Sequence, residues 1–386
     1  MKKILMLRTN KVDPDPRVEK EASAILELDN VKLDIHAWDR ESKHKCKKEK
    51  LELSNGSVDI FRVGIPANWG KGMKKNIFPA LKYEISVFFW LLRKIKNYDI
   101  IHACDLMTGL PALIPVKLFK KQMVYDCCDY YADSQEGPKF IMNILRKLET
   151  KVIDSAKVTV LCTEKRINQI YPANPQKVIY IHNSPNMENF VINDEKNKML
   201  KTNNKNLKLV YVGNYCENRW LLELLSNISN VDGVEMHIGG FGGLGKDIES
   251  IASRSNNIYV YGKLPYNEVL RLESECDCIV ALYETHIKNH IYAAPNKFYE
   301  ALAIGKPLLM LKDSGMSEIV EKENIGAVIK PNHDSLMQGI EKIKKLRGDK
   351  KMKVKMQEIF EKNYSWNIMK KRLKDVYKEL LGDKNV

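Results

Sequence analysis

The residues with the clearest chemical potential are a lysine and a glutamate three positions apart. Lys297 and Glu300 occur in PNKFYEALAIGKPLL, residues 295–309, where Pro295 opens a short predicted helix and Gly305 ends it. Side chains three positions apart share one helix face, here near the N-terminus. Amides there favour a phosphate, a lysine adds charge, and a carboxylate one turn later can bind a ribose diol. The pattern suggests a nucleotide site, although an ordinary surface Lys–Glu pair has the same spacing.

A glycine-rich string after a predicted strand is a second candidate ligand loop. Gly240, Gly242 and Gly245 in HIGGFGGLG, residues 237–245, match the GxGxxG spacing of dinucleotide sites. Such sites also need an acidic residue at the end of the next strand, which here ends at Lys263. The glycines therefore favour a loop at the edge of a ligand cleft over a nicotinamide site.

The first predicted loop carries Asp13-Pro14-Asp15, which has the DxD spacing that some metal-dependent enzymes use for manganese. Asp15 has a simpler role as the N-cap of a helix that begins with Pro16. We therefore expect no metal site. Arg17, in the first turn of this helix, either faces a ligand from the sheet edge or lies on the surface.

A regular alternation of strands and helices must position these residues. In the first half, strand-like apolar runs occur at residues 4–7, 31–35, 99–103, 123–126, 158–161 and 178–181. After a break rich in Asn, Lys and Glu they resume at residues 207–212, 234–238, 258–261, 278–282, 307–311 and 327–329. The expected fold class is α/β, with two Rossmann-like domains whose parallel sheets face a central cleft.

The break also sets the expected domain boundaries. We expect an N-terminal domain at residues 1–188, a linker at 189–206 and a C-terminal domain at 207–364, which holds the nucleotide pattern. Residues 365–386 are expected to form a last helix that crosses back to the N-terminal domain.

Composition limits the class of protein. The 386 residues include 63 Lys and Arg against 49 Asp and Glu, a net charge of +14, and eight cysteines. Without a CxxC pair, structural zinc is not expected, and buried reduced thiols favour a cytoplasmic protein. No apolar run is long enough for a signal peptide or a membrane span. The charge fits a phosphorylated ligand, an anionic membrane or a lysine-rich composition; nucleic acid is not expected, because no recognition motif is present.

PNKFYEALAIGKPLL resembles the donor-site signature of the GT-B glycosyltransferases of family 4, with their "glycosyl transferases group 1" domain. Segments in the same order along nearly the whole chain resemble other parts of the family pattern: DPDPRVEKEA, YDIIHACDLMTG, VYDCCDYY, VIYIHNSPNMENF, LVYVGNYCENRWL, NIYVYGKLPYNEVLRLESECDCIVALYE and YSWNIMKKRLKDVYKEL. The resemblance implies retaining transfer of a sugar from a nucleotide-diphosphate sugar, with a UDP-sugar favoured, to a glycan or lipid-linked acceptor. It also implies that neither a metal nor a separate cofactor is needed, and that the pathway makes cell-surface polysaccharide or glycoconjugate.

The family pattern assigns donor-binding roles in the second domain. Glu300 would bind the ribose hydroxyls, and Arg219, six residues after Gly213, matches the basic position that meets the diphosphate, with Lys297 as its neighbour. A guanidinium there would stabilise negative charge on the departing nucleotide diphosphate. The resemblance also implies donor contacts at Gly213, Asn214 and Asn296, an acceptor-side loop with Arg17, and catalytic positions at Asp105, Cys128 and Asp129.

Three positions depart from the family pattern. Tyr292 stands where the first glutamate of E-x7-E is usual, Asn214 replaces a basic residue, and Cys128 replaces the histidine of an HE pair whose acid is kept as Asp129. Either Asp129, Asp105 and the backbone suffice for activity, or the activity is weak or unusual. Cys128 as a nucleophile is a further alternative, although no partner base is evident. The second interpretation is therefore a catalytically weak or inactive nucleotide-sugar-binding protein.

One predicted helix, at residues 77–95, is strongly apolar and rich in aromatic residues. Its basic flanks are Lys71, Lys74, Lys75, Arg93, Lys94 and Lys96. It either lies on an anionic membrane surface or packs against the core with solvated ends. KHKCKKEK, residues 43–50, is expected to be a solvated loop, with a second membrane contact as the alternative. Peripheral binding to the inner face of the cell membrane is therefore a hypothesis.

Overall fold

The computed structural model describes residues 1–67, 72–135, 137–187, 198–202, 205–229 and 231–382. By their internal contacts these residues form two compact units, Met1–His182 with Met369–Val386, and Asn183–Ile368. Each unit contains one sheet of mainly parallel strands with helices on its faces, which confirms the predicted α/β class. Within the expected linker, residues 189–197 and 203–204 lie outside the described residues.

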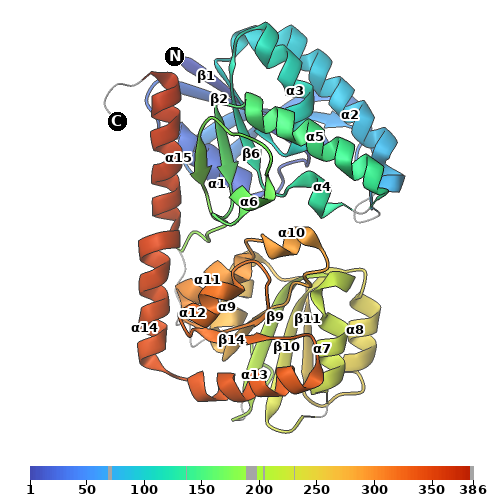
Figure 1. Ribbon diagram of the computed structural model, residues 1–386, viewed down its shortest axis with the longest axis vertical. Helices are drawn as coiled ribbons and strands as arrows, with labels where there is room; N and C mark the ends of the chain where they lie inside the picture. Colours follow the sequence, from blue (N-terminus) through green and yellow to red (C-terminus); the bar gives the residue numbers. More distant parts are fainter. Residues whose placement is uncertain (68–71, 136, 188–197, 203–204, 230, 383–386) are drawn as a thin grey trace. The chain divides into compact units, whose positions relative to one another are not determined.

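The first unit is built on an eight-stranded sheet with the order β3-β4-β2-β1-β5-β6-β7-β8, parallel except for the pair β3 and β4. Its strands are β1 (Lys2–Arg8), β2 (Val31–Asp39), β3 (His44–Leu53), β4 (Gly56–Gly64), β5 (Ile100–Cys104), β6 (Gln122–Cys127), β7 (Val158–Leu161) and β8 (Val178–Tyr180). Its helices are α1 (Pro16–Leu26), α2 (Gly72–Lys94), α3 (Leu106–Leu118), α4 (Tyr131–Ser134), α5 (Lys139–Ser155), α6 (Arg166–Gln169) and, from Met369 on, α15 (Trp366–Leu381). Figure 1 shows α2, α3 and α5 on one face of this sheet and α1 and α15 on the other.

The basic stretch at residues 43–50 is not the loop that the sequence predicted. It forms most of β3, an edge strand joined to the antiparallel β4 by a turn at Ser54-Asn55. Lysines suit this strand because Lys48 and Lys50 form ion pairs with Asp59 of β4, at 2.9 and 2.7 Å. Charged side chains on an edge strand also oppose pairing with other chains. High charge was therefore a poor reason to reject a strand here.

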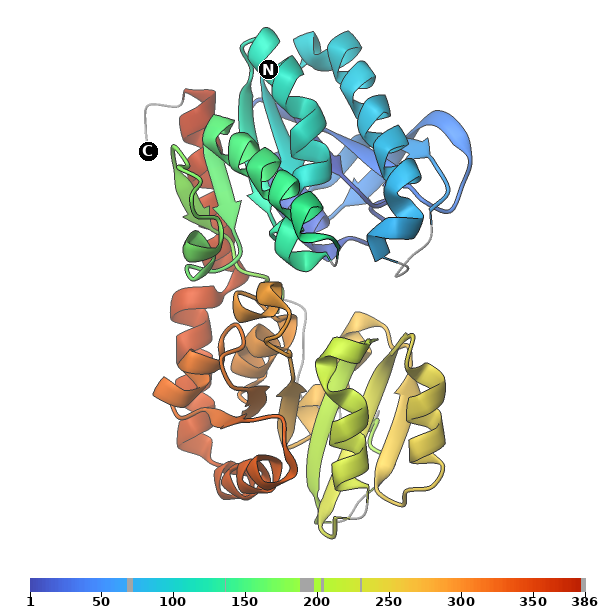
Figure 2. The ribbon, with the colours of Figure 1, turned by 45° about the vertical axis from the view of Figure 1, so that its right-hand side comes forward.

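The second unit has a fully parallel six-stranded sheet with the order β11-β10-β9-β12-β13-β14. The strands are β9 (Leu207–Tyr215), β10 (Val234–Gly242), β11 (Ile258–Gly262), β12 (Cys278–Ala281), β13 (Leu308–Leu311) and β14 (Gly326–Ile329). The helices are α7 (Leu221–Ile228), α8 (Gly245–Ala252), α9 (Tyr266–Glu275), α10 (Lys288–Ile291), α11 (Asn296–Ile304), α12 (Ser317–Lys322), α13 (His333–Leu346) and α14 (Lys350–Ile359). Figures 1 and 2 show α7 and α8 on one side of this sheet, and Figure 1 shows α9, α11 and α12 on the other.

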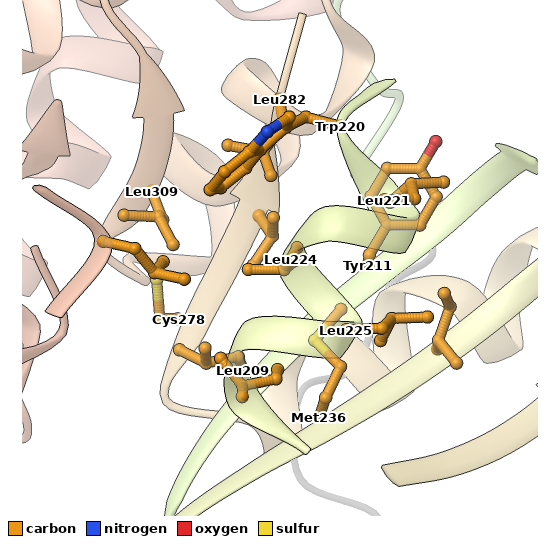
Figure 3. Close-up of a cluster of buried hydrophobic side chains, with 14 of the residues drawn as sticks. Leu209, Tyr211, Trp220, Leu221, Leu224, Leu225, Met236, Cys278, Leu282 and Leu309 are labelled. Carbon is orange, nitrogen blue, oxygen red and sulfur yellow. The ribbon is translucent and has the colours of Figure 1, made fainter. Parts of the chain in front are cut away.

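The core of the second unit fixes the start of α7. In Figure 3, Leu221 of α7 lies beside the Tyr211 ring of β9, and the Trp220 indole lies beside Leu282, which follows β12. Trp220 is 5% exposed, although its backbone is left-handed, with φ of +49°. A bulky residue in that conformation costs on the order of 1–3 kcal/mol, which burial of the indole offsets. Because Arg219 immediately precedes Trp220, this anchor also fixes the backbone of Arg219.

Candidate functional site

The helix α11 is the one that the sequence predicted from PNKFYEALAIG. Pro295 is its N-cap, and Gly305 ends it in the left-handed conformation, with φ of +75°. Lys297 and Glu300 are only 8% and 4% exposed. The alternative of an ordinary surface Lys–Glu pair is therefore wrong.

Lys297 is a buried cation without a carboxylate partner. Its Nζ lies 4.4 Å from the centre of the Tyr211 ring, and it forms no ion pair with a carboxylate of the described residues. A Cβ atom on Gly213 would come within 2.8 Å of this Nζ, so the glycine in β9 leaves room for the ammonium. Burial alone would lower the pKa of Lys297, but the acidic groups around it outweigh burial and raise the pKa. The ammonium is therefore charged at neutral pH.

Glu300 lies one helical turn after Lys297 and accepts a hydrogen bond from the Tyr266 hydroxyl at 3.0 Å. Another glutamate, Glu273 of α9, is fully buried, and neither of its carboxyl oxygens has a hydrogen-bond partner among the described residues. Burial, and then the charge of Glu300, raise the pKa of Glu273 well above its usual range, although Lys297 opposes this shift. The raised pKa favours the protonated form of Glu273, and that form does not neutralise Lys297.

Arg219 ends the short helix η3 (Glu217–Arg219) and is held by an aromatic ring and an imidazole. Its guanidinium lies 3.8 Å from the centre of the Tyr283 ring and donates a hydrogen bond to Nε2 of His290 at 2.8 Å. Since Nε2 accepts this bond, the imidazole proton is on Nδ1, which donates to the Glu284 carbonyl oxygen at 2.9 Å. Arg219 also forms no ion pair with a carboxylate in the described part of the chain. These partners fix the guanidinium without neutralising it.

The glycine-rich string forms the end of β10 and lets this strand approach β9 closely. Gly240 and Gly242 have φ of +138° and +150°, conformations that favour glycine. A Cβ atom on Gly240 would come within 1.8 Å of the carbonyl oxygen of Gly213, its partner in the β9–β10 register. The glycines therefore bring the two strand ends together next to Lys297.

The predicted donor-binding residues all belong to the second unit. Gly213, Lys297 and Glu300 lie in one cluster, and Arg219 lies at the turn that follows β9. Asn214 and Asn296 are exposed, in β9 and at the start of α11. Their roles in binding a donor stay predictions.

Arg17 is a buried ion-pair residue, so the alternative of a surface arginine is wrong. Its Nη2 lies 2.8 Å from Oδ1 of Asp126, its Nε donates to Oδ2 at 3.0 Å, and Nε is 3.2 Å from Glu21. The side chain of Arg17 is 15% exposed, and both carboxylates are 1% exposed. The charge of Arg17 is thus compensated inside the first unit.

The predicted catalytic residues Asp105, Cys128 and Asp129 lie together just after strands β5 and β6. Oδ1 of Asp105 accepts hydrogen bonds from the backbone N–H groups of Cys128 and Asp129, at 3.1 and 3.3 Å. Its Oδ2 lies 3.3 Å from Nη1 of Arg8. Burial raises the pKa of Asp105 to about 6. Asp129 is 59% exposed and accepts a hydrogen bond from Arg166 at 3.0 Å.

The surroundings of Cys128 do not favour a nucleophile. Its Sγ lies 3.4 Å from Oδ2 of Asp126 and 3.6 Å from Nη1 of Arg8. Burial, and then the charge of Asp105, raise the pKa of the thiol well above its usual value. A thiol that keeps its proton at neutral pH is a weak nucleophile.

Asp15 caps α1 as predicted, with its carboxylate accepting from the backbone N–H of Val18 at 3.3 Å. The same carboxylate accepts hydrogen bonds from Arg8 and Asn10, each at 2.7 Å. The cap is therefore confirmed, and this part of the DxD match is already engaged in protein contacts.

Sequence reasoning missed the residues that hold the two cations. Tyr283 and His290 contact Arg219 over a long separation, 71 residues for the histidine, so no local spacing marks them. Tyr211 had a usable signal, because it lies two positions before Gly213 and so points to the same face of β9. No sequence signal marked Glu273, because an acidic residue in a polar helix is expected to be exposed to solvent.

Two Rossmann-like α/β units, each with a mainly parallel sheet and helices on its faces, define the class of GT-B glycosyltransferases. Residues 163–363 match the family Glycosyl transferases group 1, and the chain therefore belongs to this family.

Solved structures agree with this fold. The chain is similar to sucrose-phosphate synthase from Thermosynechococcus elongatus, with a TM-score of 0.74, 14% identity and 99% of each chain covered. It is also similar to Alr3699/HepE from Anabaena in complex with UDP (TM-score 0.65, 13% identity, 98% of this chain and 100% of that chain). A third similar structure is the lipopolysaccharide outer core galactosyltransferase WaaB (TM-score 0.63, 13% identity, 98% and 99%). The search of curated protein sequences found no match.

Proposed function

We propose that this protein is a family 4 hexosyltransferase that moves a sugar from a nucleotide-diphosphate sugar to a glycan or lipid-linked acceptor. The favoured donor is a UDP-sugar, the transfer retains anomeric configuration, and neither a metal nor a separate cofactor takes part. The product belongs to a cell-surface polysaccharide or glycoconjugate. One observation carries the proposal: neither Arg219 nor Lys297 forms an ion pair with a carboxylate of the described residues. The UDP complex of the similar Anabaena structure supports the choice of donor.

In this proposal the second unit binds the donor and stabilises the leaving group. The Glu300 carboxylate accepts hydrogen bonds from the ribose hydroxyls, while Arg219 and Lys297 bind the diphosphate. As the bond between the anomeric carbon and the β-phosphate oxygen breaks, negative charge grows on the diphosphate, and both cations stabilise it. The acceptor oxygen forms the new bond to the anomeric carbon, and its proton leaves with the nucleoside diphosphate or to solvent.

The first unit supplies the remaining proposed positions. Asp129 has the exposed carboxylate of the predicted catalytic set, so we assign it the contact with substrate. Asp105 holds the backbone of Cys128 and Asp129, and we assign it a positioning role. Arg17, compensated by its carboxylates, supports the acceptor-side loop.

The test is a thermal-shift panel of UDP-, GDP-, dTDP- and CDP-sugars. One donor should stabilise the wild type, and Glu300→Ala should abolish that shift. Glu341→Ala removes an exposed carboxylate of α13 and should leave the shift unchanged. If none of these donors stabilises the wild type, the donor-site assignment is wrong.

The second candidate, a weak or inactive nucleotide-sugar-binding protein, is favoured by the half-buried, protonated Cys128 at the usual histidine position. Slow hydrolysis of the bound donor in the absence of acceptor separates the two. An enzyme releases nucleoside diphosphate at a rate that Asp129→Asn lowers, whereas a binding protein shows a thermal shift without release.

We also propose that α2 places the protein on the inner face of the cell membrane. No helix in the described part of the chain combines the length and apolar character needed to cross a membrane. One face of α2 packs into the core through Tyr83, Val87 and Leu91, as the core-packing alternative expected. The opposite face is also apolar and is about half exposed or more, at Ile77, Phe78, Leu81, Ile85 and Phe89.

The basic residues on α2 favour an anionic bilayer as the surface that this outer face contacts. Exposed Lys82, Arg93 and Lys94 lie on α2, and Glu84 is its one acidic residue. Burial raises the pKa of Glu84 to about 7, which halves its opposing charge near neutrality. Of the other predicted basic flanks, Lys96 is exposed in the following turn, while Lys71 and the side chains of Lys74 and Lys75 lie outside the described residues.

Flotation with lipid vesicles tests this membrane contact. The protein should float with vesicles of anionic phospholipid in low salt, and with phosphatidylcholine vesicles much less. Phe78→Ser with Phe89→Ser should abolish flotation, whereas Tyr171→Ser, which removes another exposed aromatic ring of the first unit, should not. Absence of wild-type binding in both low and high salt would show that the face has another use.

A further inference from the structure

Three residues that can bind a metal ion lie together inside the first unit. His102 and Cys104 are two positions apart on β5, so their side chains point to the same face of the sheet. Asp126 of β6 is the register partner of Cys104. All three side chains are fully buried, and one ligand atom from each lies within 4.8 Å of the other two. Because the residues come from two strands, no local spacing marks them, and the lack of a CxxC pair does not exclude a metal here.

The imidazole of His102 has a nitrogen that faces acidic groups without bonding to them. Its Nε2 has no hydrogen-bond partner among the described residues, and it lies 3.9 Å from Oδ2 of Asp126 and 3.8 Å from Oε2 of Glu21, on α1. These separations are too long for hydrogen bonds. Neither carboxyl oxygen of the buried Glu21 has a hydrogen-bond partner in the described part of the chain, although Arg17 lies 3.2 Å away. Buried polar atoms without hydrogen bonds are costly, so this arrangement indicates a missing partner.

The other ring nitrogen of His102 is held by α15, which covers this face of the sheet together with α1 (Figure 1). Nδ1 lies 2.6 Å from the hydroxyl oxygen of Tyr377, which is also fully buried. When Nδ1 carries the ring proton and donates a hydrogen bond to this oxygen, the lone pair of Nε2 is left for a metal ion. A metal-binding histidine usually makes such a bond, because it fixes the tautomer and the ring orientation. The contact with Tyr377 therefore prepares His102 as a ligand.

We propose that this cluster binds a structural zinc ion inside the first unit. The ligands are Nε2 of His102, the thiolate of Cys104, and one carboxylate oxygen each of Asp126 and Glu21. Zinc binds such groups at about 2.0–2.3 Å in a tetrahedron, which places ligand atoms about 3.3–3.8 Å apart. The separations of 3.8 and 3.9 Å at Nε2 are close to that range.

The charges of the cluster also suit a divalent ion. On binding, Cys104 loses its thiol proton to solvent, because a thiol that coordinates zinc is deprotonated. The three anionic ligands then balance the charges of zinc and of Arg17, which stays paired with Asp126. The ion joins α1 to β5 and β6 directly, and to α15 through the Tyr377 hydroxyl. It serves the stability of the first unit and takes no part in the proposed sugar transfer.

Spectroscopy with Co²⁺ as a substitute for zinc tests the proposal on the full chain. After a chelator has removed bound metal, one equivalent of Co²⁺ should produce a thiolate-to-cobalt charge-transfer band, and Zn²⁺ should abolish that band by displacement. Zn²⁺ should also raise the midpoint of thermal unfolding. Cys104→Ser should remove the band. His102→Gln should weaken zinc binding by more than about 100-fold, and Tyr377→Phe, which alters only an outer partner, by about tenfold.

Two buried residues of the second unit provide matched controls. Cys278 of β12 is a fully buried free cysteine, and Cys278→Ser should leave the charge-transfer band unchanged. His237 of β10 is buried as well, and its Nε2 lies 3.5 Å from a carboxylate oxygen of Glu235 without a hydrogen-bond partner among the described residues. His237→Gln should leave zinc affinity unchanged.

The wild type alone can overturn the proposal, whether or not the variants fold. If it shows neither a charge-transfer band with Co²⁺ nor a thermal shift with Zn²⁺, the cluster holds no metal. A band that persists in Cys104→Ser would place the ion at another cysteine, such as the exposed Cys46, and would contradict the proposal. Equal loss of zinc affinity in His102→Gln and His237→Gln would likewise contradict a site built on β5.

Discussion

In the first unit the guanidinium groups of Arg8, Arg17 and Arg166 each contact a carboxylate, whereas in the second unit Arg219 and Lys297 contact aromatic rings. The first arrangement satisfies its charge within the protein and joins strands and helices far apart in sequence. The second arrangement leaves the positive charge available to an anionic ligand. Because a buried cation without an ion pair is unfavourable, the burial of Lys297 is better explained by an anionic ligand than by stability.

The aromatic partners make the second arrangement tolerable. A ring face attracts a cation without neutralising it, and the neutral His290 adds an acceptor for Arg219. A carboxylate in either place would lower the free-protein energy but would compete with a diphosphate. The difference between the units shows that the partners of a cation indicate whether it serves stability or ligand binding more clearly than its burial does.

The largest expected effect breaks the compensated arrangement. Asp126→Asn removes one of the two carboxylates paired with Arg17, and removal of one partner of a buried pair typically costs about 3–5 kcal/mol of unfolding free energy. Asp375→Asn is the control, because its partner Lys371 is 77% exposed and such a surface pair contributes at most about 1 kcal/mol. Urea unfolding measures both. Equal losses in the two variants would contradict the structural role given to the first cluster.

Lys297→Met tests the opposite arrangement. Removal of a charge-assisted contact to the diphosphate should raise the dissociation constant of UDP by about 100-fold, while the unfolding free energy stays the same or rises. The control is Lys306→Met, which removes the contact from Nζ to the Cys276 carbonyl oxygen, at 2.6 Å. That variant should lose stability and keep UDP affinity. If the Lys297 variant lost stability without losing UDP affinity, Lys297 would serve stability, as the paired arginines of the first unit do.

The sequence predicted what depends on local pattern. The alternation of apolar runs gave both sheets, and local capping rules correctly placed Asp15 at the start of α1 and Gly305 at the end of α11. The three-residue spacing put Lys297 and Glu300 near the helix N-terminus. The β3–β4 hairpin was missed because its edge strand is unusually rich in lysine, and the turn signal before Gly56 was not used.

What the sequence could not supply is the partner of each charge. Arg17 and Asp126 are 109 residues apart, and Arg219 and His290 are 71 apart. Such contacts depend on which strands become neighbours and how the loops after them fold. Arg17 and Arg219 therefore look alike in sequence, each an arginine shortly after the first strand of its unit, and only their contacts show that Arg17 forms ion pairs and that Arg219 forms none with the described residues.

Variants of His290 sharpen the comparison with a smaller effect. His290→Ala removes the acceptor that orients Arg219 and should weaken UDP binding by about tenfold, the value of one hydrogen bond to a charged group. His290→Gln offers an amide oxygen and should recover most of the affinity. His286, exposed and just before α10, is the control, and His286→Ala should have no effect. Equal weakening by the Gln and Ala variants would mean that the ring itself, rather than its acceptor atom, supports Arg219.

Measured per pH unit, the smallest effect concerns Glu149, a buried acid of the first unit. Burial raises the pKa of Glu149 to about 8, although Tyr125 donates a hydrogen bond to it at 2.7 Å. The folded state therefore holds a proton that the unfolded state loses near pH 4.5, so stability is full below that pH and falls as pH rises toward 8. Glu149→Gln, which mimics the protonated form, should flatten the decline in unfolding free energy between pH 5 and 8 by about 1 kcal/mol per pH unit. Glu358→Gln, which alters an exposed side chain of α14, should leave the slope unchanged, and an unchanged slope in Glu149→Gln would show that this carboxyl is ionised in the folded protein.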